Sequence, residues 1–167
     1  MNLKTSDWKR IVREITNEIK SLRKEIDEIK KIDKIEYEKL GINSSMEPYA
    51  SLEVYEETTR DFPMYNLAAE SRMKKLESLR TKKNYFEKLL LGIKCIALYR
   101  SKNLSKAAER NGFVDNKSYA DALVKNEGYS IDEVIDILNK YFMEDNFSFD
   151  HFRMEEKSAD SVGKMFR

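Results

Sequence analysis

The side chains best suited to bind a ligand follow one another closely after residue 115, and the chemistry they suit is hydrogen bonding to DNA. On a helix there, the outward positions are expected to be Lys117, Ser118, Asp121 and Lys125. Lysine can reach guanine edges or phosphates, serine can contact either, and aspartate can accept from a cytosine amine. The Asn116 side chain and the free N–H groups at the helix start would contact phosphate. These five side chains form the predicted DNA-binding set.

Few residues of this chain are of a type and spacing that could support catalysis. His151 is the only histidine and lies among phenylalanines, so we expect a packing or solvent role rather than a place in a catalytic triad. Cys95, the only cysteine, lies in an apolar run and is expected to be a small core residue. The sequence has no cysteine–histidine cluster for zinc and no glycine-rich phosphate loop. We therefore expect no catalytic residue, no metal, no cofactor and no enzyme activity.

The DNA-binding set needs a rigid support, and residues 102–142 have the pattern of a helix-turn-helix unit. Ala108 is small enough to let a second helix pack closely, and Gly112 can take the positive φ of a tight turn. Helices are expected over 104–110 and 117–126, with a third starting after Ser130. The expected caps are Asp115 or Asn116 and a capping box of Ser130 and Glu133. The expected buried residues are Leu104, Ala107, Ala108, Tyr119, Ala122, Leu123, Ile131, Val134, Ile135, Leu138 and Phe142.

Two long helices would carry this unit. From Trp8 onward, apolar residues recur at alternating steps of four and three, the heptad pattern of a helix that buries one seam. The seam consists of Trp8, Val12, Ile15, Ile19, Leu22, Ile26 and Ile29. The phase breaks near Ile32 and Ile35, and Gly41 would cap the helix. A second helix should run from 64 to 99, antiparallel to the first, after a connector at 41–63. Its expected buried face is Ala69, Leu76, Leu79, Phe86, Leu90, Ile93 and Ala97.

The predicted fold is therefore all-α. Residues 1–100 would form a helical hairpin or coiled coil, 101–142 a three-helix unit, and 143–167 an aromatic and acidic tail. The tail is either docked on the body or held for a partner. The seam fits an intramolecular hairpin and a homodimer equally well.

Charge is strongly segregated along the chain. The net charge is only +1, yet residues 71–106 carry 11 basic and 2 acidic side chains. Such a segment attracts polyanions. A stripe of Lys74, Lys82, Tyr85 and Lys88 is thus a second expected nucleic-acid surface. The alternative is an ordinary solvated helix face.

Composition limits the class of protein. Charged residues make up 37% of the 167 positions, with only five glycines and two prolines, which favours helices over a sandwich or barrel. A single cysteine suits a reducing compartment. Neither a membrane span nor a secretion signal is recognisable. A soluble, cytoplasmic protein with no membrane partner is expected.

Two family resemblances point to transcription. The positions Ala108, Gly112, Phe113, Asp115, Ser118, Tyr119, Gly128 and Ser130 resemble the second DNA-binding motif of AraC-type regulators. One extra residue before Ser118 and the lack of a first motif depart from that family. The whole layout is similar to that of ArpU/RinA-type regulators of phage late genes. This resemblance implies a phage or mobile-element transcriptional regulator whose partners are double-stranded DNA and RNA polymerase.

Protein-binding alternatives remain open at this stage. Residues 101–142 carry 6 basic and 7 acidic side chains, whereas a typical groove reader is more basic. The chain would then be a helical inhibitor or adaptor that acts through residues 1–40 and the tail, or a structural coiled-coil protein. The edge formed by Lys117, Asp121 and Lys125 decides between these hypotheses. If the long helices or the tail cover it, a clasp for another protein fits better.

Overall fold

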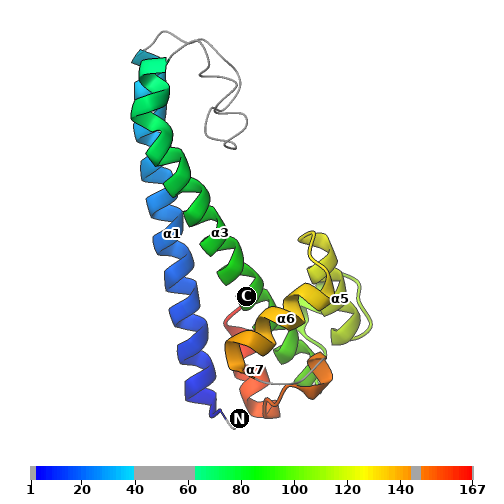
Figure 1. Ribbon diagram of the computed structural model, residues 1–167. Coiled ribbons are helices and arrows are strands. Elements are labelled where there is room, and N and C mark those ends of the chain that lie inside the picture. Colours follow the sequence, from blue (N-terminus) through cyan, green and yellow to red (C-terminus); the bar gives the residue numbers. More distant parts are fainter. Residues whose placement is uncertain (1–2, 40–62, 144–147, 167) are drawn as a thin grey trace. The chain divides into compact units, whose positions relative to one another are not determined.

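The computed structural model describes residues 3–39, 63–143 and 148–166, and the described part consists of helices joined by loops, without a strand (Figure 1). Its helices are α1 (Thr5–Lys39), α3 (Pro63–Arg100), α4 (Lys106–Arg110), α5 (Asn116–Asn126), α6 (Ile131–Phe142), the 3₁₀ helix η1 (Phe149–His151) and α7 (Glu156–Lys164). The predicted all-α fold is thereby confirmed. The predicted connector lies outside the described residues except at Pro63. None of the described helices combines the length and the apolar character needed to cross a bilayer.

The chain divides into two compact units that cut across the predicted boundaries at 100 and 142. One unit contains residues 1–17 and 85–167, and we call it the head unit; the other, residues 18–84, is the hairpin unit. Each long helix therefore contributes to both units.

In the hairpin unit, α1 and α3 run antiparallel side by side, as predicted (Figure 1). The buried apolar residues are Ile19, Leu22, Ile26, Ala69, Met73, Leu76 and Leu79. Burial of these side chains supplies most of the favourable free energy of such a pair. Arg72 fixes the alignment, since its guanidinium donates to Asp33 at 3.3 Å and to Glu36 at 2.6 Å. The heptad phase ends where predicted, with Ile32 and Ile35 about half exposed.

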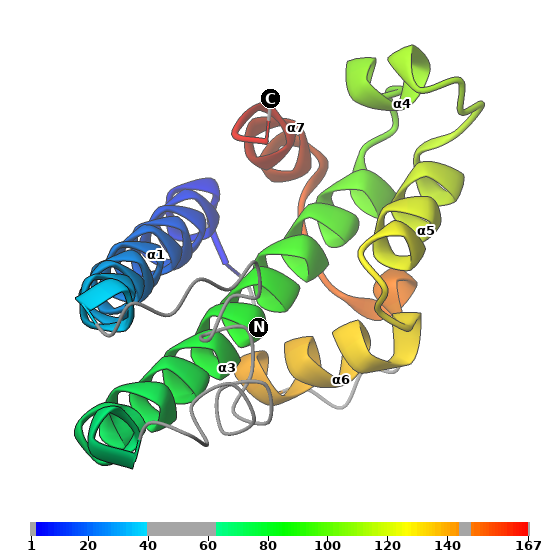
Figure 2. The same ribbon diagram turned by 90° about the horizontal axis from the view of Figure 1, so that it is seen from above.

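The head unit is built around the last four turns of α3. Leu89, Ile93 and Ile96 are fully buried there. Gly92 allows α6 to approach closely, because a Cβ at this position would lie 2.7 Å from the Leu138 side chain. Figure 2 shows α5 and α7 on opposite sides of these turns. The core is therefore made by residues far apart in the sequence.

The C-terminal segment is docked on the head unit. Its buried residues are Phe149, Phe152, Met154, Ser158, Ala159 and Val162. Arg100 donates hydrogen bonds to the backbone carbonyls of Asp150 and Phe152. Of the two options that the sequence left open, the described part of the tail takes the docked one.

The α4–α5 turn has the predicted chemistry. Gly112 has φ 79°, Ala108 is fully buried, and the Phe113 N–H donates to the Ala108 carbonyl at 3.0 Å. These bonds close the end of α4 as glycine-terminated helices usually do. The predicted capping box of Ser130 and Glu133 at the start of α6 is also present.

Five residues of this region that were expected to be buried are not: Leu104 is exposed, and Ala107, Ala122, Leu123 and Ile131 are half-buried. Leu104 is 43% exposed, because it precedes α4 in a loop instead of lying on the helix. On α5, Ala120 and Val124 are fully buried, whereas Ala122 and Leu123 are half-buried. The buried stripe follows Asn116, Tyr119, Ala120 and Val124, so the helix is rotated relative to the expectation.

Candidate nucleic-acid interface

Helix α5 is held firmly at its start and against α3. The Asp115 carboxylate accepts a hydrogen bond from the Ser118 N–H at 2.7 Å, which lowers the pKa of Asp115. On the buried side, the Cys95 thiol lies 3.8 Å from the Ala120 carbonyl. The residues that remain exposed on α5 include Lys117, Ser118 and Lys125. A short helix therefore has one face packed in the head unit and one polar face exposed.

The sequence predicted that Asn116 faces outward, and this prediction is wrong because Asn116 is buried. Its side chain is only 7% exposed. Its Oδ1 accepts from the Ser105 N–H at 2.8 Å, and its Nδ2 donates to the Asn103 carbonyl at 2.9 Å. Because both ends of the amide are engaged, Asn116 ties α5 to the loop before α4 and has little left to offer a phosphate.

Asp121 is engaged by α3. The Tyr99 hydroxyl donates to its Oδ1 at 2.7 Å. Burial, together with this hydrogen bond, raises the pKa of Tyr99. The Tyr99 ring also packs against Phe149 of η1, with ring centres 5.1 Å apart and the planes tilted by 49°. Asp121 is thus part of the packing between α3, α5 and the C-terminal segment.

Lys117 is engaged more loosely. Its Nζ lies 3.0 Å from Asp150 Oδ1 and 5.5 Å from the centre of the Tyr99 ring. Both charged side chains of this ion pair are 58% exposed. An exposed pair of this kind contributes about 0–1 kcal/mol, so a phosphate could replace the carboxylate. Along the edge formed by Lys117, Asp121 and Lys125, Asp121 is held by a hydrogen bond from α3. Lys117 forms an exposed ion pair that a phosphate could replace, and Lys125 is exposed.

The predicted stripe on α3 divides between the two units. In the hairpin unit, Lys82 is exposed, and Lys74 pairs with Glu70 at 3.3 Å. In the head unit, Tyr85 is 39% exposed. Lys88 is turned inward, with its Nζ 4.7 Å from the Tyr129 ring and 3.8 Å from Glu133. Lys88 therefore serves packing within the head unit.

The heptad seam is occupied within the chain. Six of its members, Trp8, Val12, Ile15, Ile19, Leu22 and Ile26, are at most 5% exposed, and Ile29 is half-buried. Trp8 packs against Phe142 with ring centres 5.4 Å apart. A homodimer would have to use another surface.

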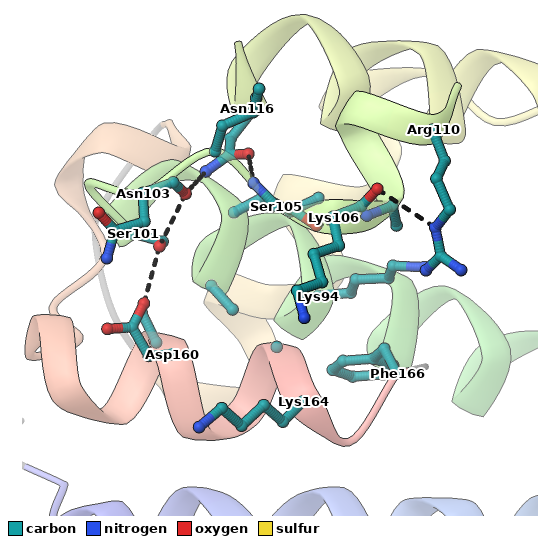
Figure 3. A pocket seen from close by; sticks show the side chains of 16 residues that line it. Lys94, Ser101, Asn103, Ser105, Lys106, Arg110, Asn116, Asp160, Lys164 and Phe166 are labelled. Atoms are coloured by element: carbon teal, nitrogen blue, oxygen red, sulfur yellow. Dashed lines mark hydrogen bonds between the residues drawn. The ribbon is translucent and has the colours of Figure 1, made fainter. Parts of the chain in front are cut away.

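A basic pocket at the α3–α4–α7 corner was missed from the sequence (Figure 3). Its basic residues are Lys94, Lys106, Arg110 and Lys164. One signal was present: Lys94 is the only charged residue in the otherwise apolar run from 89 to 98. The contribution of α7 could not be foreseen, because it depends on how the C-terminal segment docks.

The groups that could support catalysis are placed as expected from the sequence. Cys95 is buried, and burial raises the pKa of its thiol to about 12. His151 is exposed, and its Nδ1 lies 3.1 Å from the Ser148 hydroxyl. Within the described ranges, no three acidic, histidine or cysteine side chains gather as a metal site would require.

Comparison with known proteins gives no relative for this chain. No family model, no curated protein and no solved structure matches it. The resemblances to AraC-type and ArpU/RinA-type regulators therefore stay predictions. The functional argument depends on the geometry of the head unit.

Proposed function

We propose that this chain binds double-stranded DNA by placing α5 in the major groove. The observation that carries the proposal is the exposed face of a firmly packed helix, with Lys117, Ser118 and Lys125 on it. A major groove admits one α-helix, and a helix-turn-helix inserts its second helix there. The tight turn at Gly112 gives α4 and α5 the required connection.

The contacts within this face differ from the first prediction. Ser118 and Lys125 would contact bases or phosphates directly, and Lys117 would exchange Asp150 for a phosphate. Asn116 and Asp121 would position the helix from within the unit. The basic side chains Lys74 and Lys82 would add sequence-independent affinity for the backbone.

The role we propose is transcriptional regulation in a phage or mobile element, with RNA polymerase as a further partner. This finer assignment draws its support from the resemblances found in the sequence. Both resemblances describe proteins that bind DNA through a small helical unit after other helices.

The protein-binding alternative has less support from the geometry. It needed residues 1–40 and the aromatic tail as contact surfaces. Six seam residues of α1 are buried within the chain, and so are Phe149 and Phe152 of the tail. A partner would have to displace both sets of contacts first.

The test is binding of a fluorescent mixed-sequence duplex at several salt concentrations. The wild type should bind the duplex, and its affinity should fall as the salt concentration rises. The reason is that lysine side chains that neutralise phosphates release counterions from the DNA. The triple variant Lys117→Ala, Ser118→Ala, Lys125→Ala should bind more weakly. Its salt slope should fall by about 2, roughly one for each lysine that meets a phosphate.

Lys140→Ala is the matched control. Lys140 is an exposed lysine of α6 that pairs with Asp136 within the same helix, so its loss should leave DNA affinity unchanged. If the triple variant binds DNA like this control, α5 is not the DNA-binding element. A partner captured equally well before and after nuclease treatment would favour the adaptor hypothesis instead.

A further inference from the structure

The head unit contains a pocket of about 320 Å³ between the end of α3, the loop and helix α4, and helix α7. Four basic side chains and one carboxylate, that of Asp160, line it. Figure 3 shows the Lys94 amine between Lys106 and Arg110 on one side and Lys164 and Phe166 on the other. The volume is at the lower end for small-molecule sites in proteins.

Lys94 is the unusual member of this pocket. It is half-buried, and its Nζ faces two aromatic rings, Tyr119 at 5.9 Å and Phe166 at 5.7 Å. Among the described residues no carboxylate pairs with it. Desolvation lowers the pKa of this amine. A partly desolvated amine of this kind is well placed to interact with an anionic ligand.

The other three cations are also without a carboxylate partner within the described part of the chain. Neighbouring lysines differ, since Lys102 pairs with Glu156 at 3.5 Å and Lys117 with Asp150 at 3.0 Å. The one acidic side chain in the pocket, Asp160, accepts from the Ser101 hydroxyl at 2.8 Å. The pocket therefore carries an excess of positive charge, with four basic side chains and one carboxylate.

The pocket also has apolar lining. It is provided by Ala97, Leu98, Leu104 and Phe166. Leu104 is 43% exposed, which the sequence did not predict. A ligand with a compact hydrophobic group would cover these side chains and gain affinity from the apolar surface that it removes from water.

We propose that this pocket binds a small phosphate monoester that carries a compact apolar or aromatic group. The phosphoryl oxygens would accept hydrogen bonds from Lys94, Arg110 and their two basic neighbours, because lysine and arginine are the usual phosphate partners. The organic group would lie against Leu98, Leu104 and Phe166. This inference is independent of DNA binding by α5.

The test is calorimetric titration of the full chain with phenyl phosphate, inorganic phosphate and phenol. Phenyl phosphate should bind saturably, at one molecule per chain, and more tightly than either of the other two probes. Lys94→Met keeps the length of the side chain and removes the charge, so it should weaken phenyl phosphate about tenfold or more. Lys140→Met, on the surface of α6, should change nothing.

A second variant guards against a folding defect at Lys94. Arg110 and Lys164 are exposed, so the double variant Arg110→Gln, Lys164→Gln should fold normally and also lose phenyl phosphate affinity. Three results would overturn the proposal: no saturable binding of phenyl phosphate, unchanged affinity in both variants, or inorganic phosphate bound as tightly as the ester.

A DNA arm separates the two sources of phosphate. In the absence of phenyl phosphate, Lys94→Met should bind the mixed-sequence duplex as the wild type does. If Lys94→Met lowers the affinity for the duplex and leaves the affinity for phenyl phosphate unchanged, the pocket belongs to a nucleic-acid site and the small-ester proposal is wrong. Failure of DNA binding by α5 leaves the phenyl phosphate result untouched.

Discussion

Asn116 links the start of α5 to the loop before α4, because both ends of its side-chain amide are hydrogen-bonded there. Its partners at Ser105 and Asn103 are 11 and 13 positions away, so only the folded loop reveals its structural role.

Asn116→Ala should therefore affect stability. It removes the partners of the Ser105 N–H and the Asn103 carbonyl, and unsatisfied groups of this kind cost about 1–3 kcal/mol. Urea unfolding would measure the loss, with the exposed Ser118→Ala as control. A variant of unchanged stability that binds DNA poorly would instead restore Asn116 to the DNA-binding set.

Cys95 should be unreactive in the folded protein. Its thiol is fully buried and its pKa is raised from 9.0 to about 12 by burial, so almost no thiolate is available for alkylation. Iodoacetamide should label the native chain slowly and the urea-unfolded chain rapidly. Equal rates in the two states would contradict the burial of Cys95.

The same pKa shift predicts a pH dependence of stability. Between about pH 9 and 12 the folded thiol keeps its proton while the unfolded thiol loses it. The free energy of unfolding should therefore fall as pH rises through this range. Cys95→Ala should show a smaller fall, as measured by urea unfolding at each pH. An identical fall in both proteins would mean that Cys95 is not the group responsible.

At the scale of elements, the close approach of α3 and α6 is the most testable contact. A methyl group at Gly92 would lie 2.7–2.9 Å from three atoms of the fully buried Leu138. Overpacking costs about 1–3 kcal/mol, whereas alanine gains about 1 kcal/mol over glycine inside a helix. Because three side-chain atoms of Leu138 would have to shift inside the buried core, Gly92→Ala should lower the free energy of unfolding, as chemical denaturation would show.

Two comparisons make this prediction specific. A Cβ added at Gly163 on α7 would meet no neighbouring atom within 4 Å, so Gly163→Ala should be neutral or stabilising. In a Leu138→Ala background, Gly92→Ala should stop being destabilising, since the clash is gone. A Gly92→Ala penalty that persists in that background would place its cause elsewhere.

The sequence predicted the helices better than their faces. Heptad spacing and end signals located α1, α3, α5 and α6 to within a few residues, because these signals are local. The sequence did not predict the orientation of α5, because the burial of Ala120 and Val124 depends on contacts with helices that are distant in the sequence. For the same reason, Lys88 and Asp121 were assigned to ligand contact although Tyr129 and Tyr99 engage them.

At the scale of the whole molecule, the C-terminal segment is a structural part of the head unit. Phe149 is 2% exposed and packs against the Tyr99 ring, and the Tyr99 hydroxyl donates a hydrogen bond to Asp121. Phe149→Ala should cost about 3–5 kcal/mol, which lowers Tm by about 10 °C in a chain of this size. Val114→Ala, at an 87% exposed position, is the control for thermal unfolding. Equal Tm values for Phe149→Ala and the wild type would contradict the docking of the C-terminal segment on the head unit.

The burial of the seam also predicts the oligomeric state. Since α1 packs its apolar residues within its own chain, sedimentation should give a mass near 19.7 kDa. A stable dimer whose interface includes Leu22 or Ile26 would require the hairpin to open, and would contradict the burial found in each unit.

The central claim is that the exposed face of α5 meets DNA, and photocrosslinking from that face tests it most directly. A benzophenone would be attached at Ser118→Cys or, as control, at Lys140→Cys, both in a Cys95→Ala background. With a short mixed-sequence duplex at low salt, the probe at position 118 should crosslink to DNA and the probe at position 140 should not. Equal yields from both positions, or no crosslink from position 118, would contradict the claim.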